Sequence, residues 1–153
     1  MNGLSVLGGL KVQQKNHLRV NTDLNELVQV LSWFEKFNQP QIPREVWLQC
    51  QTALAEGLTN AIRHAHKDQP VETPIDIEVE TSTDTLQIRI WDQGQPFDLN
   101  SRLEKTTNTV DFTASSGRGL QILKSVADHI SYSVTEDNRN CLLIVKHYAA
   151  TKP

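Results

Sequence analysis

Three short runs of polar and glycine residues carry side chains that could do chemistry. The first is A-E-G-L-T-N-A-I-R-H-A-H, in which Glu56, Asn60 and His64 stand four residues apart. Residues at this spacing share one side of an α-helix, with a drift of roughly 40° per step. A carboxylate and an amide oxygen facing one point could serve a divalent cation and a proton transfer. A solvated helix face has the same spacing, so this run alone leaves both interpretations open.

The second run, I-W-D-Q-G-Q-P-F-D, follows a segment that alternates apolar and polar residues. It predicts that Asp92 ends a buried strand at a turn, where Gly94 permits a close approach of the backbone. A carboxylate there can accept a hydrogen bond from an exocyclic amine, such as that of adenine. A plain Asp-x-Gly turn is the alternative, because such turns are common.

The third run, S-S-G-R-G-L, ends just before a predicted helix. Gly117 and Gly119 would let backbone N–H groups crowd toward a ligand, and the positive end of the helix favours a phosphate chain. Arg118 would add a cation or point into solvent. Glycine also serves ordinary loops, so this run by itself is weak evidence.

Helical periodicity supplies the elements that must hold these residues. Leucine and other apolar residues recur at helical spacing from about Asp23 to Asn38, and Asp23 with Glu26 gives a start that resembles a capping box. A second, longer helix is predicted from Pro43 to about His66. A third is predicted over 119–128.

Alternating segments predict the strands. They cover 75–81 and 85–91, joined by a tight turn, then 129–135 and 140–147, with a short extended segment at 17–20. The long polar stretch 92–116 is typical of a functional loop. We therefore predict an α/β (α+β) two-layer sandwich: a mixed, mostly antiparallel sheet with three helices on one face. The 153 residues predict a single domain over 1–153, with a core at about 17–147.

Composition narrows the classes of function. The net charge of −3 and pI near 5.9 give no basic footprint, so we expect no direct nucleic-acid binding. No apolar run approaches the roughly 18 residues that span a bilayer, and the first eleven residues do not read as a signal peptide but as a frayed leader. Cys50 and Cys141 lie in apolar patterns and predict two buried thiols. These features favour a cytoplasmic protein without membrane contact.

Together, the three runs resemble the N, G1 and G2 boxes of the GHKL superfamily of ATP-binding domains. The resemblance covers roughly residues 20–147. Within that superfamily, E-G-L-T-N-A-I-R-H-A and D-Q-G-Q-P-F-D look like the branch of anti-sigma-factor serine/threonine kinases. Sensor histidine kinases usually have a second glycine where Pro96 stands.

The resemblance implies a role for each polar residue. Asn60 would present its side-chain oxygen to Mg²⁺, which bridges the phosphates of ATP. Glu56 would act as general base on, or would orient, the hydroxyl of a protein serine or threonine. Asp92 would read the adenine amine, with Gly94 giving the base room. Phosphoryl transfer needs positioning and charge neutralisation more than covalent chemistry, and these groups would supply both.

The resemblance also implies an ATP lid over 99–116, with Gly117 and Gly119 lining the phosphates. The wider set that we expect to contact the nucleotide adds His64, Arg118 and Leu120. The basic residues near the lid are mainly Arg102, Lys105 and Arg118, so no contact to the γ-phosphate stands out.

The resemblance favours a kinase that phosphorylates a STAS-type anti-sigma-factor antagonist and, in another complex, holds a sigma factor. The family also implies a homodimer, for which the apolar first helix beside an N-terminal strand could supply the surface. A catalytically weak, ATP-gated protein-binding module is the main alternative. An ATPase that works with a separate histidine-containing protein and a scaffold that binds no nucleotide are the others.

Overall fold

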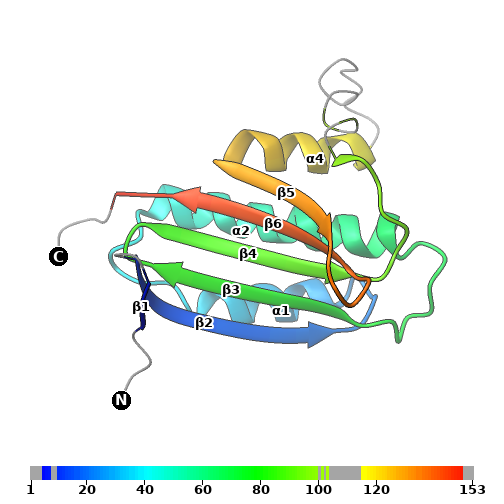
Figure 1. The fold of residues 1–153 in the computed structure, drawn as a ribbon, viewed down its shortest axis with the longest axis horizontal. Helices are drawn as coiled ribbons and strands as arrows, with labels where there is room; N and C mark the ends of the chain where they lie inside the picture. Colours follow the sequence, from blue (N-terminus) through cyan, green and yellow to red (C-terminus); the bar gives the residue numbers. More distant parts are fainter. Residues whose placement is uncertain (1–4, 8–9, 100, 102, 104–114, 150–153) are drawn as a thin grey trace.

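A single antiparallel sheet carries helices on one face (Figure 1). The computed structural model describes residues 5–7, 10–99, 101, 103 and 115–149, and for 5–7, 10–13 and 115–118 it describes the backbone alone. Within these residues the sheet has six strands in the order β1-β2-β3-β4-β6-β5. The elements are β1 (Ser5–Leu7), β2 (Leu10–Val20), α1 (Glu26–Glu35), α2 (Arg44–Asn60), the π-helical turn η1 (Ala61–Ala65), β3 (Ile75–Ser82), β4 (Thr85–Asp92), α4 (Ser115–Val126), β5 (His129–Val134) and β6 (Asn140–His147).

The core lies between the sheet and the helices. Alternation along β3 and β4 points every second side chain inward, because successive side chains of a strand face opposite sides. Ile77 of β3 pairs with Ile90 of β4, and both are almost completely buried. From the helices, Phe34 of α1 stacks on Trp47 of α2 with ring centroids 4.2 Å apart. Burial of these large side chains fixes α2 against the sheet.

The opposite face of the sheet is polar and held by ion pairs. Asp76 of β3 accepts hydrogen bonds from Arg19 at 2.8 Å and from Arg139 at 2.6 Å, and His17 lies 3.0 Å away. Burial alone would raise the pKa of the Asp76 carboxyl, but the hydrogen bond from Arg19 and the surrounding positive charges hold that pKa below its ordinary value. Arg139 also lies over the ring of Trp91.

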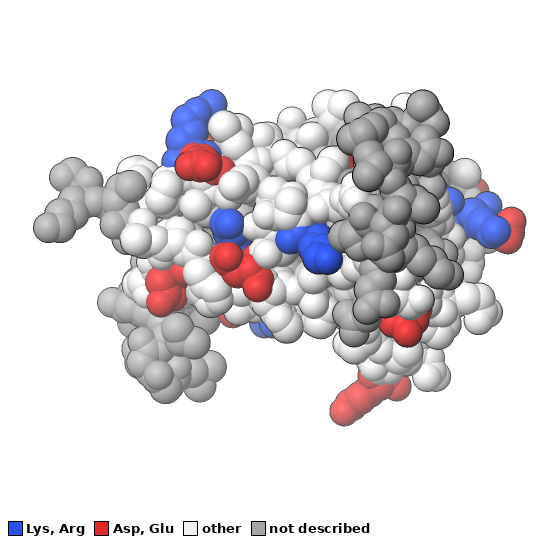
Figure 2. Space-filling view, turned by 90° about the horizontal axis from the view of Figure 1, so that it is seen from above, with Lys and Arg blue, Asp and Glu red and all other residues white. Residues whose placement is uncertain are grey.

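The surface seen from above mixes both signs of charge. In a few places on the described part of this face Lys and Arg side chains lie close to Asp and Glu side chains, and most of the surface between them is uncharged (Figure 2). Among the residues that the structure describes, no helix is both long and apolar enough to cross a membrane.

The predicted fold class is confirmed, and each pairing between the described strands is antiparallel. The predicted strands at 75–81, 85–91, 129–135 and 140–147 all form, to within about one residue. The expected burial of Cys50 and Cys141 is also confirmed. The single-domain prediction stays a prediction.

Several predicted boundaries were wrong. The extended segment predicted at 17–20 is the end of the longer strand β2, and the first helix ends at Glu35 instead of near Asn38. The first helix begins at Glu26, because Asp23 accepts a hydrogen bond from the Asn25 N–H in a turn before the helix and does not cap it. The expected frayed leader contains β1, whose backbone pairs with β2 at the edge of the sheet. The third helix begins at Ser115, four residues earlier than predicted, so the glycine run lies inside the helix.

Candidate functional site

Asp92 is the last residue of β4 and is 2% exposed. Its Oδ1 accepts the Gly94 N–H at 2.9 Å and the Asn140 side-chain amide at 2.8 Å. Its Oδ2 accepts the Tyr132 hydroxyl at 3.1 Å. A buried charge needs such partners, and here they come from the next turn, from β6 and from β5. The carboxylate is thereby fixed in place as an acceptor at the end of the sheet.

The turn that follows Asp92 is docked onto η1. A Cβ atom at Gly94 would lie 2.1 Å from the carbonyl oxygen of Ala65, so only glycine fits there. The N–H of Gln93 donates to Nε2 of His66 at 2.7 Å. Asn140 donates a second hydrogen bond to the carbonyl oxygen of Gly94 at 2.8 Å. The backbone of the turn after Asp92 is therefore held by Ala65 and His66 on one side and by Asn140 on the other, and these contacts fix the position of Asp92.

The buried side chain of His66 connects the turn after Asp92 to Thr22. It is 1% exposed, and its Nδ1 lies 2.8 Å from Oγ1 of Thr22, which donates its own proton to the carbonyl oxygen of Thr73. Because Nε2 accepts from Gln93, the ring proton sits on Nδ1 and the imidazole is neutral. Burial lowers the pKa of His66, although the negative charge of Asp92 opposes that shift.

The end of the long helix is widened into a π turn. The N–H of His66 donates to the carbonyl oxygen of Ala61, five residues back, at 2.9 Å. Such turns are rare and occur frequently at functional sites. The predicted second helix is thus interrupted after Asn60, and the π turn presents Ala65 and His66 to the turn after β4.

The other end of the site lies along the last turn of α2 and the start of η1. Glu56, Asn60 and His64 line one recess, together with Gly119 and Leu120 of α4. The predicted grouping on one side of the helix is thus what the structure has. The recess is small, with a volume of about 20 Å³. A Cβ atom at Gly119 would lie 2.8 Å from Oε2 of Glu56, so α4 packs directly on the carboxylate.

The first turn of α4 contains part of the predicted phosphate run. The N–H of Gly117 belongs to the first four of this helix, which have no acceptor within it. Gly119 lies two residues further along the helix, where its lack of a side chain lets α4 approach Glu56 closely. The side chain of Arg118 and most of the expected lid, including Arg102 and Lys105, lie outside the described residues.

A larger pocket of about 500 Å³ adjoins the base of this site. Its walls are the end of η1 with the three residues that follow His66, and the loop after β4 from Gln95 to Phe97. His64 borders both this pocket and the recess at Glu56. The volume lies in the range that small-molecule pockets have.

Among the described residues, no group of three or more His, Cys, Asp or Glu side chains could hold a metal ion. Asn60 offers one hard amide oxygen beside the recess. That donor set fits a Mg²⁺ ion that takes its remaining ligands from phosphates and water, as Mg²⁺ commonly does. It does not fit a metal centre made of protein ligands alone.

Sequence patterns did not identify Tyr132, Asn140 or His66 as parts of the site. Tyr132 and Asn140 are 40 and 48 residues from Asp92 in the chain. The sequence pattern placed His66 only at the predicted end of the second helix. A buried asparagine at a strand start is the one signal that could have pointed to Asn140, because buried amides need partners.

The model of the histidine kinase-like ATPase domain matches residues 20–146 of this chain. The chain belongs to the histidine kinase-like ATPase family. It is similar to proteins named serine-protein kinase RsbW from the Staphylococcus aureus strains bovine RF122 / ET3-1, MSSA476 and JH9, with 31% identity over 84 residues. These residues make up 52% of this chain and 53% of each relative, so the chain spans about half the length of the relatives it matches.

Membership in the histidine kinase-like ATPase family confirms the resemblance drawn from the three boxes. The similarity to serine-protein kinases over about half of the chain agrees with the branch that the sequence indicated. ATP is the nucleotide that membership in this family implies.

Proposed function

We propose that this protein is a Mg-ATP-dependent serine/threonine-protein kinase that acts as an anti-sigma-factor regulator. It would phosphorylate a STAS-type anti-sigma-factor antagonist and, in another complex, sequester a sigma factor or a similar partner. The observation that carries the proposal is the recess that Glu56 and Asn60 share, on the same helix whose end holds the turn of Asp92. The similarity to serine-protein kinases supports the choice of acceptor.

The nucleotide would run along α2 and η1. From Glu56 to Ala65 the helix advances about 13 Å. This length separates the end that would bind adenine, near Ala65, from the end that would carry out catalysis, near Glu56. At the first end Asp92 would accept the adenine amine, and the close packing of Gly94 on Ala65 keeps that turn in place. At the other end the N–H groups in the first turn of α4, with Gly117, would face the phosphates.

The reaction needs few groups. The hydroxyl oxygen of a serine or threonine attacks the γ-phosphorus, the bond from that phosphorus to the bridging oxygen of ADP breaks, and Glu56 takes the hydroxyl proton. A Mg²⁺ ion held by Asn60 would neutralise charge on the phosphates. His64 and Leu120 line the same recess and would contact the nucleotide there. A contact from Arg118 stays a prediction.

The test is transfer of labelled phosphate from ATP to a purified STAS-type antagonist, with Glu56→Gln and Asn60→Ala beside the wild type. Loss of one catalytic acid–base group typically costs about 10²–10⁴-fold in rate, so we expect the Glu56→Gln variant to bind Mg-ATP but transfer at least a hundredfold more slowly. Asn60→Ala should weaken Mg-ATP binding in calorimetry. No transfer by the wild-type protein would contradict the kinase proposal, and transfer by Glu56→Gln at the wild-type rate would contradict the role of Glu56 as the base. An acid-labile product would indicate a histidine acceptor instead.

An ATP-gated binding module without phosphotransfer is the second candidate. The small size of the recess at Glu56, about 20 Å³ with Gly119 packed beside the carboxylate, favours it, because this space is too small for a γ-phosphate and an attacking hydroxyl together. Saturable Mg-ATP binding that changes partner capture, with no labelled product from several antagonists, would select this candidate.

A further inference from the structure

The two oxygens of Asp92 differ in what already binds them. Oδ1 accepts two donors, the backbone N–H of Gly94 and the amide of Asn140, and that amide also holds the carbonyl oxygen of Gly94. These contacts build the turn itself, so they persist when a ligand arrives. Oδ2 accepts from the Tyr132 hydroxyl. Oδ2 is therefore the oxygen with which Asp92 can read a base.

The Tyr132 hydroxyl takes the place of an incoming donor. A phenol O–H and an exocyclic amine N–H each donate one hydrogen bond to a carboxylate oxygen. Asp92 is 2% exposed, which leaves little room for a second donor at the same oxygen. A nucleobase that binds Oδ2 thus replaces the hydrogen bond from Tyr132 with one from its own amine. Its binding free energy gains only the difference between these two hydrogen bonds.

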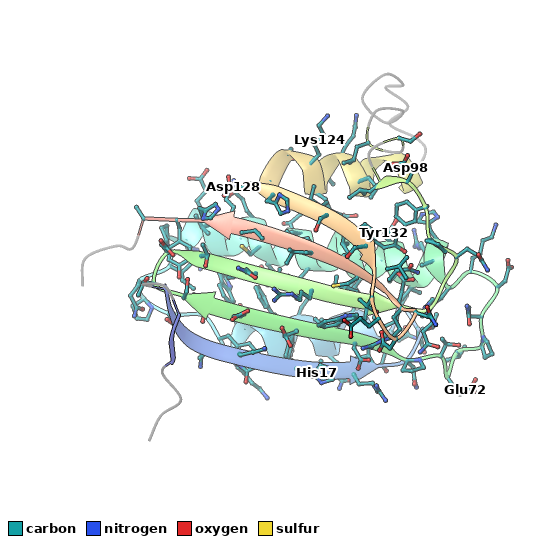
Figure 3. All side chains as sticks on the ribbon, in the orientation of Figure 1. His17, Glu72, Asp98, Lys124, Asp128 and Tyr132 are labelled. Carbon is teal, nitrogen blue, oxygen red and sulfur yellow. The ribbon has the colours of Figure 1, made fainter. Side chains whose placement is uncertain are left out.

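An aromatic stack lies over this contact. The ring of Phe97 stacks on that of Tyr132, with centroids 4.3 Å apart and planes 27° from parallel. Phe97 also lines the pocket of about 500 Å³, whereas Asp92 does not reach it. Figure 3 places Tyr132 on β5, near the passing loop that carries Asp98. The stack therefore stands between the open pocket and the base-reading oxygen.

We propose that Tyr132 is an internal competitor for the adenine amine at Oδ2 of Asp92, and that the base enters only when the stack of Tyr132 on Phe97 opens. This inference rests on the proposed function, because it takes Asp92 as the residue that reads adenine. When only a small fraction of a protein has the conformation that binds a ligand, the apparent affinity is reduced in proportion to that fraction. Tyr132 consequently sets the nucleotide affinity without being part of the catalytic machinery.

The variant Tyr132→Phe keeps the ring and the stack but removes the competing donor. A hydrogen bond to a charged group such as the Asp92 carboxylate contributes about 1.5–3 kcal/mol net, which corresponds to roughly ten- to 150-fold in affinity. We expect Tyr132→Phe to bind Mg-ATP, ADP and adenosine more tightly by that common factor in calorimetry. Inorganic tripolyphosphate, which has no base, should bind with the wild-type affinity.

Tyr148→Phe is the matched control. Tyr148 donates its hydroxyl to the carbonyl oxygen of Ser82, away from the site, and its loss should leave nucleotide affinity unchanged. If Tyr132→Phe does not fold, as judged by circular dichroism, Phe97→Leu tests the same stack from its other side. We expect that variant also to bind adenosine more tightly than the wild type does.

The outcomes separate this inference from the proposed function. If the wild-type protein binds Mg-ATP and Tyr132→Phe binds it with equal or lower affinity, the proposed competition is overturned. The kinase proposal is then unaffected. A variant that binds adenosine where the wild type does not supports the competition strongly. Absence of ATP and adenosine binding in both proteins overturns the two proposals together.

Discussion

His66 is a single residue on which both the base-reading turn and the end of η1 depend. Burial lowers its pKa below the ordinary value of about 6.5, so the unfolded chain takes up a proton before the folded protein does. Stability must then fall as the pH drops below about 6.5 toward the folded-state pKa. The loss is at most about 1.4 kcal/mol per pH unit for one such group. Denaturant unfolding between pH 7.5 and 5 measures it.

The variant His66→Gln isolates this contribution. A glutamine can accept from Gln93 and donate to Thr22, but it does not titrate. We expect its unfolding free energy to change less over the same pH range than that of the wild type. Asp76, whose folded pKa is also lowered, loses its contribution only below about pH 4, outside this window. Parallel pH curves for the two proteins would contradict the role given to His66.

At the scale of elements, two glycines mark where helices dock, and they differ in what opposes them. A methyl group at Gly94 would meet a backbone oxygen of η1, whereas one at Gly119 would meet the end of the flexible Glu56 side chain. We expect Gly94→Ala to lower the free energy of unfolding by about 1–3 kcal/mol. Gly119→Ala should change it by less than about 1 kcal/mol, because alanine favours the helix, yet it should slow phosphotransfer by displacing Glu56. Urea unfolding that gives equal losses would contradict this difference.

The sequence could predict the elements whose signal is local. Alternation along β3 and β4 comes from a sheet with one buried face, and it located both strands closely. Glu56, Asn60 and Asp92 were proposed as site residues because they stand at helical spacing or at the predicted end of a strand. The π turn could not be predicted, because it depends on Ala65 and His66 meeting the turn after β4. Contacts of Asp92 with Tyr132 and Asn140 join distant parts of the chain, and no short pattern encodes them.

For the whole molecule, the predicted homodimer is the property most open to test. Val28 on α1 is 75% exposed and Leu24 just before that helix is 39% exposed. If α1 forms the two-fold surface, Val28→Asp should convert a dimer into a monomer in light scattering while the fold is kept, because one exposed substitution usually changes stability by less than about 0.5 kcal/mol. Val134→Asp, at a valine that is 58% exposed on β5, is the control and should leave the dimer intact. Monomeric wild-type protein would remove the proposal.

Because the chain is synthesised from its N-terminus, the residues that contact Asp92 through its side chain emerge from the ribosome later than Asp92 itself. Glu56, Asn60 and Asp92 leave the ribosome early, but Tyr132 and Asn140 lie on β5 and β6, near the C-terminal end of the described chain. Until β6 pairs with β4, the carboxylate of Asp92 lacks its amide partner and the turn of Gly94 lacks one of its anchors. A nascent chain halted before residue 140 therefore holds the predicted catalytic residues without a formed base site. Nucleotide capture would begin only after β6 has emerged and paired, so ATP can stabilise the finished fold without trapping a partial one.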